Sequence, residues 1–185
     1  MSSLTREYGS GQLSDRQIKD INNARARAVS RAWSREKEYV KEGKGTRDWT
    51  PQQQEDILNN GNVQGFEGHH MRSVSNGKTY EEQMRIAEDK DNIQFLEKTK
   101  DNNEHLAAHG GNTQNRTNGQ YDPKTGNTRD FGTGAPQAPK AEKLSDPVSK
   151  ESKKEESHVD QYGVDHSKTG ADHGYETERS QGRKR

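Results

Sequence analysis

Four of the seven histidines of this chain lie between residues 69 and 109, as an adjacent pair, His69-His70, and a pair four residues apart, His105 and His109. Two imidazoles at the second spacing share one helix face and can reach one metal ion. A third imidazole from a neighbouring hairpin gives three nitrogen ligands with open positions, as a catalytic divalent metal requires. Alternatively, His105 and His109 are surface side chains near a helix end, where the helix dipole favours histidine.

The histidines must act without cysteine, because the chain contains none. This excludes a disulfide framework and a thiolate zinc site, so any metal is held by imidazole and carboxylate groups. Only 23% of the 185 residues are hydrophobic and 32% are charged, which is too polar for the whole length to bury one core. Lysine plus arginine equals aspartate plus glutamate at 30 each, so the overall charge predicts no partner.

Two helices are predicted upstream of the histidines. In residues 14–41 apolar side chains recur at helical spacing, and Ser14 or Asp15 can cap the start. The second helix begins at Thr50-Pro51, a capping threonine followed by proline in the first turn, and Gln53 completes a capping box. Trp33 and Trp49 are predicted to anchor the core rather than to stack on bases, since each lies in an apolar or capping context.

One predicted strand and one predicted helix carry the four histidines, and a second strand lies between them. In chain order the segments are a strand at 63–74 with a kink at Gly68, a short helix capped by Thr79, a strand at 93–96 directly after Asn92, and a helix that begins near 101–103. Neighbours on a regular strand point to opposite faces, so His69 and His70 both enter one site only if the strand bends. Gly68 can supply that bend.

This order of elements resembles that of the ββα-metal, or HNH, nucleases. More specifically, the motifs are similar to the GHH group of HNH/endonuclease VII toxin domains, found at the C-termini of bacterial polymorphic toxins such as the Rhs-repeat proteins. The similar segments are 24–40, 45–51, 65–74, 91–96 and 105–112. The resemblance implies an α+β fold, with a small ββα-metal core that follows helices and precedes a disordered tail.

The resemblance also implies roles for the residues. His70 would be the general base that takes a proton from water, and His69, His105 and His109 would hold the metal. Asn92 would be structural, its side chain bonding backbone so that the loop presents His70. The swapped assignment, with His69 as the base and His70 as a ligand, stays open on geometric grounds.

One segment departs from the family pattern. Residues 97–103 separate Asn92 from His105 by more positions than the family leads us to expect. We interpret them as a looped-out insertion that leaves the site intact. The alternative, that Asn102 or Asn103 replaces Asn92, is disfavoured because neither adjoins an apolar strand.

Arginines offer candidate contacts to nucleic acid. Arg27, Arg31 and Arg35, with Arg25 nearby, recur at four-residue steps along the polar side of the first helix and are expected to contact phosphates. The alternative is an ordinary solvated helix face. Arg72, which follows the histidine pair, is a further candidate phosphate clamp.

The predicted domain boundaries follow composition. Residues 1–13 are a flexible lead-in, 14–119 form the nuclease domain, and 120–185 form a disordered low-complexity tail of mixed charge. The tail histidines are expected to be solvated rather than to form a second metal site, and the basic end at 182–185 is too short to assign. These three histidines are His158, His166 and His173.

The resemblance implies a metal-dependent endonuclease that hydrolyses phosphodiester bonds of DNA, with RNA not excluded. Because no helix-turn-helix or zinc finger is visible, non-specific cleavage is expected. Used as an antibacterial toxin, such an enzyme needs a cognate immunity protein as its partner. Two alternatives stay open: a phage or housekeeping HNH endonuclease with no toxin role, and a catalytically inactive module that binds nucleic acid or protein.

One divalent ion is the expected cofactor. Three imidazoles suit Zn, Ni or Co, whereas Mg and Mn, which also remain candidates, prefer oxygen ligands. The N-terminal residues lack the apolar region of a Sec signal peptide, and no stretch approaches the roughly 18 apolar residues of a membrane span. A toxin role therefore predicts a secreted effector with no membrane partner, which acts in the target-cell cytoplasm after delivery by another route.

Overall fold

The computed structural model describes residues 11–148 of the chain. Helices dominate its first half, and three small two-stranded antiparallel sheets lie between and after them. The elements are α1 (Asp15–Lys41), β1 (Lys44–Gly45), α2 (Pro51–Asn60), β2 (Phe66–His70), η1 (Val74–Asn76), α3 (Tyr80–Glu88), η2 (Lys90–Asn92), β3 (Ile93–Glu97), α4 (Glu104–Ala108), β4 (Gly119–Tyr121), β5 (Thr128–Asp130) and β6 (Glu142–Lys143). The predicted α+β class is confirmed.

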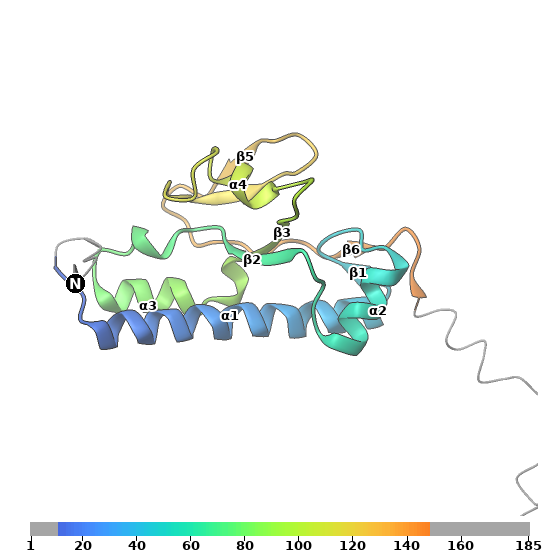
Figure 1. Ribbon diagram of the computed structural model, residues 1–185, viewed down its shortest axis with the longest axis horizontal. Coiled ribbons are helices and arrows are strands. Elements are labelled where there is room, and N and C mark those ends of the chain that lie inside the picture. Colours follow the sequence, from blue (N-terminus) through green and yellow to red (C-terminus); the bar gives the residue numbers. More distant parts are fainter. Residues whose placement is uncertain (1–10, 149–185) are drawn as a thin grey trace, which may run out of the picture.

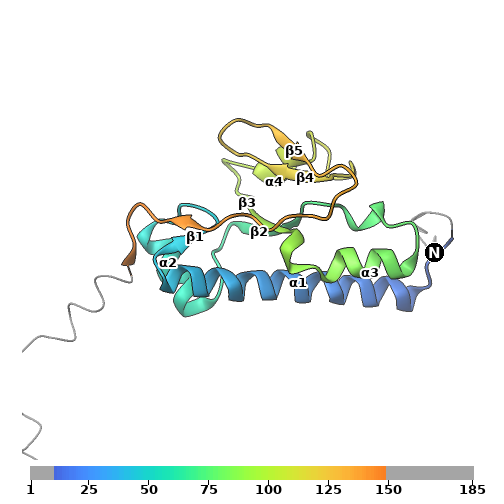
Figure 2. The ribbon, with the colours of Figure 1, turned by 180° about the vertical axis from the view of Figure 1, so that it is seen from behind.

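Helix α1 is the base on which the other elements pack. It begins at a capping box in which the Ser14 side chain accepts from the Gln17 N–H and the Gln17 side chain accepts from the Ser14 N–H. In Figures 1 and 2 the β2–β3 hairpin lies between α1 and a layer formed by α4, β4 and β5. Helix α3 packs beside the N-terminal half of α1, and α2 packs at its other end.

The β2–β3 hairpin keeps the regular alternation of its side chains. Its register is uninterrupted, with Gly68 opposite Phe95, His69 opposite Gln94 and His70 opposite Ile93. One face meets α1, because Phe95 stacks on Trp33 with ring centroids 3.8 Å apart. On the other face, the amide of Gln94 bonds the backbone of Tyr121 in β4. His69 and His70 therefore point to opposite faces.

The expected bend at Gly68 is absent, because the strand register is uninterrupted. A glycine is needed at this position for a different reason. A Cβ placed on Gly68 would lie 2.7 Å from the Val29 side chain of α1. Glycine is thus required for the close approach of β2 to the helix. The predicted strand at 63–74 is also shorter in the structure, where it covers Phe66–His70.

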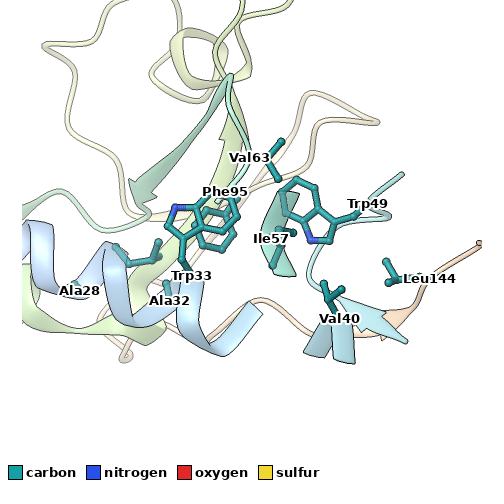
Figure 3. Packing of buried hydrophobic residues seen from close by; sticks show 10 residues of the cluster. Ala28, Ala32, Trp33, Val40, Trp49, Ile57, Val63, Phe95 and Leu144 are labelled. Carbon is teal, nitrogen blue, oxygen red and sulfur yellow. The ribbon is translucent and has the colours of Figure 1, made fainter. Parts of the chain in front are cut away.

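The core fills the space between α1, α2 and the hairpin. Trp33 and Trp49, predicted as core anchors, are both buried, and their ring centroids lie 5.9 Å apart. Figure 3 shows Phe95 against Trp33, with Trp49 closer to Val40 and Leu144. The Trp49 indole N–H donates to buried Glu36 at 2.6 Å, so the ring places no unpaired donor in the core.

The fold continues beyond residue 119, where the sequence analysis placed its end. Strands β4 and β5 form a hairpin, and β6 pairs with β1 so that Lys143 lies opposite Lys44. Leu144 enters the main core, and Gln54 bonds the backbone of Asp146 and Val148. This segment was predicted to be disordered because apolar residues are sparse, but buried Tyr121 and Leu144, together with hydrogen bonds to its backbone, dock it. That boundary is corrected to at least residue 148.

Part of the predicted tail lies outside the described residues. These positions include His158, His166, His173 and the basic end at 182–185, as well as most of the expected lead-in at 1–13. Within residues 11–148, no helix has the length and apolar character needed to cross a membrane.

Candidate metal centre

Three histidines from two elements converge on one point. His69 comes from β2, and His105 and His109 come from α4 and its C-cap. One ring nitrogen of each lies within 4.8 Å of those of the other two. The pairwise ring-centroid distances are 5.2 Å, 5.0 Å and 4.9 Å. The structure thus brings together the three histidines that the sequence analysis assigned as ligands.

The nitrogens at the centre of this cluster have no competing partners. Nε2 of His69 and Nδ1 of His105 are buried without a hydrogen-bond partner among the described residues. Nδ1 of His109 donates to the backbone carbonyl of Asn115 at 2.8 Å, which leaves the lone pair on Nε2. Burying unpaired nitrogens costs free energy, which a shared cation would offset. The donor set therefore fits a divalent metal ion.

The cluster keeps its histidines in the form that binds metal. Burial, followed by the neighbouring imidazoles, lowers the pKa of His69 to about 3. Burial and His109 also lower the pKa of His105. Both rings are therefore neutral near pH 7, and a neutral imidazole is the metal-ligating species.

Helix α4 is short but firmly positioned. The Asn103 side chain caps it by accepting from the Leu106 N–H at 2.8 Å. Glu104 accepts two hydrogen bonds from Arg47 and one from the Glu97 N–H, which ties the helix to β3 and to the loop before α2. These contacts set the distance between α4 and His69.

The 97–103 segment forms the loop-out that the sequence analysis expected. The Thr99 N–H donates to the Asn102 carbonyl in a backbone turn, and Lys98 forms an isolated antiparallel β-bridge with Asn103. Asn102 bonds Glu97, while Asn103 caps α4. Neither asparagine makes the backbone contacts that Asn92 makes after β2.

The three histidines line a cleft of about 500 Å³. His70 lies outside the cluster but lines this cleft too, so both histidines of the pair reach one cleft although the strand register is uninterrupted. Its Nε2 lies 2.9 Å from the Ala87 carbonyl in α3. Because a carbonyl only accepts, Nε2 carries the proton and Nδ1 keeps the lone pair. Burial lowers the pKa of His70 to about 4, so the ring is neutral near pH 7. The geometry therefore disfavours the swapped assignment, in which His70 is a ligand.

Asn92 fixes the chain just after the histidine pair. Its side chain is fully buried; the oxygen accepts from the Arg72 N–H at 2.7 Å, and the amide donates to the Arg72 carbonyl at 3.0 Å. The Asn92 carbonyl also accepts from the Met71 N–H. These are the backbone contacts expected of a structural asparagine that positions His70.

Of the five arginines named in the sequence as candidate contacts to nucleic acid, Arg25 lines the histidine cleft and the other four do not. Arg27 and Arg31 are exposed elsewhere on α1, and Arg35 pairs with Asp91 at 2.9 Å. The Nε of Arg72 donates to Asn118 at 2.7 Å, and its Nη2 contacts the Gly132 and Gly134 carbonyls. Arg27, Arg31 and Arg35 lie on the polar side of α1, whereas the histidine cleft lies on the side of α1 that packs against other elements.

Arg25 and Arg116 are the two arginines that line the cleft in the described part of the chain. Arg25 was named in the sequence beside the predicted phosphate contacts, and it lies next to Ala24 and one turn from Ile21, both of which are buried. No sequence signal pointed to Arg116. It follows Asn115, whose side-chain amide donates to the His109 carbonyl at 2.8 Å and whose own carbonyl orients the His109 ring.

Part of the chain matches a known protein family. Residues 16–97 match a family described as "GHH signature containing HNH/Endo VII superfamily nuclease toxin". The match confirms the resemblance seen in the sequence and includes His69, His70 and Asn92. It ends before α4, so the convergence of His105 and His109 on His69 rests on the structure.

The curated relatives found are teneurins. The chain is 36% identical to teneurin-3 of Mus musculus over 85 residues, which cover 45% of this chain and 3% of that protein. It is 33% identical to Mus musculus teneurin-4 over 94 residues, 50% of this chain and 3% of the relative. For teneurin-m of Drosophila melanogaster the values are 33% over 76 residues, 40% and 3%. The chain therefore spans a small fraction of these relatives.

Proposed function

We propose that this segment, which matches a nuclease toxin family, is part of a metal-dependent endonuclease that hydrolyses DNA phosphodiester bonds with little sequence preference. The observation that carries the proposal is the set of three imidazole nitrogens within 4.8 Å of one another, two of them buried without partners. Open coordination positions beside three protein ligands distinguish a catalytic metal site from a structural one.

In this proposal His69, His105 and His109 hold one divalent ion. When bound, the ion stabilises negative charge on the scissile phosphate and on the leaving oxygen. Arg25, which lines the same cleft, adds positive charge where the phosphate approaches. The all-nitrogen donor set favours Zn, Ni or Co over Mg or Mn.

His70 is proposed to accept the proton of the attacking water. Its Nε2–H is held by the Ala87 carbonyl, so Nδ1 is the nitrogen able to accept. Asn92 does not touch the reacting atoms and acts as a positioning residue, because its amide fixes the backbone two residues after His70. The hydrogen bond from His70 to α3 also prevents the ring from turning toward the metal ligands.

The biological setting extends this proposal. The name of the matched family supports a nuclease toxin. Such a toxin would be delivered to a target cell, act in its cytoplasm and be neutralised in the producer by an immunity protein. A net positive cleft favours an immunity protein with an acidic contact surface. Co-expression with such a partner should relieve toxicity, whereas a phage or housekeeping endonuclease would need no dedicated inhibitor.

A second candidate is a catalytically inactive binding module. The similarity to teneurins favours it, since none of their names refers to a nuclease. Against it stands the histidine cluster, which an inactive module has no need to keep.

The test is cleavage of supercoiled plasmid by the full chain with Zn, Ni, Co, Mg or Mn, and with EDTA. We expect nicking that depends on the ion and disappears in the His70→Ala variant. His158→Ala serves as the matched histidine control, because it lies outside the described domain. Single-stranded RNA is tested in parallel for substrate preference. Failure of every ion to support cleavage of either nucleic acid would leave the binding module as the function.

A further inference from the structure

A second groove adjoins the histidine cleft. It encloses about 590 Å³ and is lined by arginines from three places in the chain, with asparagines and one carboxylate between them. The three arginines are Arg72, Arg85 and Arg116. Arg116 lines both the groove and the histidine cleft, so the two cavities meet at this side chain.

The charge of these two cavities differs from that of the chain as a whole. The chain has a formal net charge of zero. Cleft and groove together are lined by Arg25, Arg72, Arg85 and Arg116 against the single carboxylate of Glu82. In contrast, the larger cavity of about 1040 Å³ near β4 and β5 is lined by equal numbers of acidic and basic side chains. Positive charge is thus concentrated beside the histidines.

Two of the groove arginines are available to a ligand. Arg85 and Arg116 are exposed and form no ion pair with any residue in the described range 11–148. Arg72 is held by Asn118 and forms part of the wall. The Glu82 carboxylate accepts from the Lys78 N–H at 2.6 Å, so it is engaged within its own helix start.

The position of Arg116 is built into the fold. The next residue, Thr117, forms three hydrogen bonds with Ser73: its N–H donates to the Ser73 hydroxyl at 2.8 Å, its carbonyl accepts from the Ser73 N–H at 2.9 Å, and the two hydroxyls lie 3.1 Å apart. The Asn76 amide donates to the same carbonyl. These bonds fix the backbone at the boundary between cleft and groove.

We infer that the groove of Arg85 and Arg116 binds the DNA backbone that flanks the phosphodiester at the histidine cluster. The inference rests on the proposed function for the identity of the ligand. Guanidinium groups bind phosphate oxygens in a bidentate manner without reading the base, which suits cleavage of any sequence. The backbone then passes from Arg25 and the histidines across Arg116 to Arg85, and it does not enter the larger cavity of balanced charge.

The test is binding of a fluorescently labelled duplex oligonucleotide by the full chain in EDTA, where no cleavage occurs, at a series of salt concentrations. We expect Arg85→Ala and Arg116→Ala each to weaken binding and to lower the slope of log K against log salt by about 0.9 for each phosphate that the variant no longer neutralises. Arg129→Ala, in the larger cavity, is the matched control and should bind like the unaltered chain. Thermal unfolding of each variant verifies that the fold is retained.

The outcomes separate this inference from the proposed function. Unchanged affinity and salt slope in both groove variants, or an equal weakening in Arg129→Ala, would overturn the groove assignment. Weaker binding confined to the groove variants, combined with no plasmid cleavage under any ion, would support the groove and reject the nuclease.

Discussion

Arg47 and Glu104 form a bidentate ion pair that joins the loop before α2 to the first residue of α4. Nη1 of Arg47 lies 2.8 Å from Oε2 of Glu104, and Nη2 lies 3.0 Å from Oε1. The Arg47 guanidinium also lies 5.0 Å from the centre of the Phe66 ring and bonds the Phe95 carbonyl. The residue after Glu104 is a proposed metal ligand, so this pair positions the metal centre without touching it.

Glu104→Gln should weaken metal binding by about tenfold, the lower end of the range for residues that orient ligands. Burial alone would raise the pKa of Glu104, but the hydrogen bonds from Arg47 and the Glu97 N–H lower it, so the carboxylate is charged in the folded protein. The amide keeps the shape and loses the charge. Titration of the ion by calorimetry measures the effect.

Lys41→Ala is the control for this variant. It breaks the exposed pair with Glu38 on α1, far along the chain from α4, and exposed pairs contribute little to stability. Equal metal affinity in Glu104→Gln and the unaltered chain would show that α4 holds its ligands without Arg47.

Metal binding and cleavage should separate between the two adjacent histidines. Addition of the ion at a hundredfold excess over its dissociation constant should stabilise the unaltered chain by about 2.7 kcal/mol. His69→Ala should abolish this shift, because it removes a ligand. His70→Ala should keep the shift and lose cleavage. Thermal unfolding with and without the ion, alongside plasmid nicking, tests both; loss of the shift in His70→Ala would reverse the roles.

The metal-free protein should lose stability in mild acid because of its buried imidazoles. In the unfolded chain a histidine takes up a proton below about pH 6.5. In the folded chain the pKa is about 3 for His69 and about 4 for His70. Protons therefore favour unfolding, and the free energy of unfolding should fall as the pH drops from 6.5 towards 4, by about 1.4 kcal/mol per pH unit for each histidine.

Urea unfolding at several pH values measures this dependence. Carboxylates also titrate in acid, so the informative quantity is the difference from His69→Asn and His70→Asn. Each variant should show a shallower pH dependence between 6.5 and 4 than the unaltered chain. Identical slopes would mean that these rings are protonated in the folded state.

Gly68→Ala should destabilise the domain, and a second substitution should relieve the effect. The added methyl group would lie 2.7 Å from two atoms of Val29, so the hairpin must move away from α1. Overpacking of this kind costs about 1–3 kcal/mol. In the double variant with Val29→Ala, the alanine leaves space for the methyl group. A double-mutant cycle of unfolding free energies that shows simple additivity would contradict the contact.

Leu144→Ala should cost about 2–5 kcal/mol of unfolding free energy, the usual range for a buried leucine. Leu144 is 6% exposed and belongs to the same core as Trp49. Leu106→Ala is the matched control, because Leu106 is 36% exposed. A loss of stability below that of the control would mean that the segment after residue 119 is not docked in solution.

Local chemistry in the sequence predicted much of the fold. The caps at Ser14, Thr50 and Thr79 each bond the N–H three residues later, because capping depends only on neighbours in the chain. The pairing of His105 with His109 follows in the same way from helical periodicity. Such features need no knowledge of the tertiary structure.

Contacts between distant segments were not predictable in this way. Arg35 looked free in the sequence, but Asp91 lies beside it in the fold. Leu144 is an isolated apolar residue whose core position depends on strand pairing with β1. Arg116 reaches the cleft because Thr117 is tied to Ser73, a contact across 44 positions. In each case the partner is set by topology rather than by spacing.

The pairing of β6 with β1 has a consequence for how the domain folds and opens. Lys44 meets Lys143, so the pairing closes a loop between residues 99 positions apart, and closing so large a loop is entropically costly. Strands this short contribute few bonds once formed. The β1–β6 pair is therefore expected to form last during folding and to open first in the native state. Its amide protons should exchange before those of the β2–β3 hairpin.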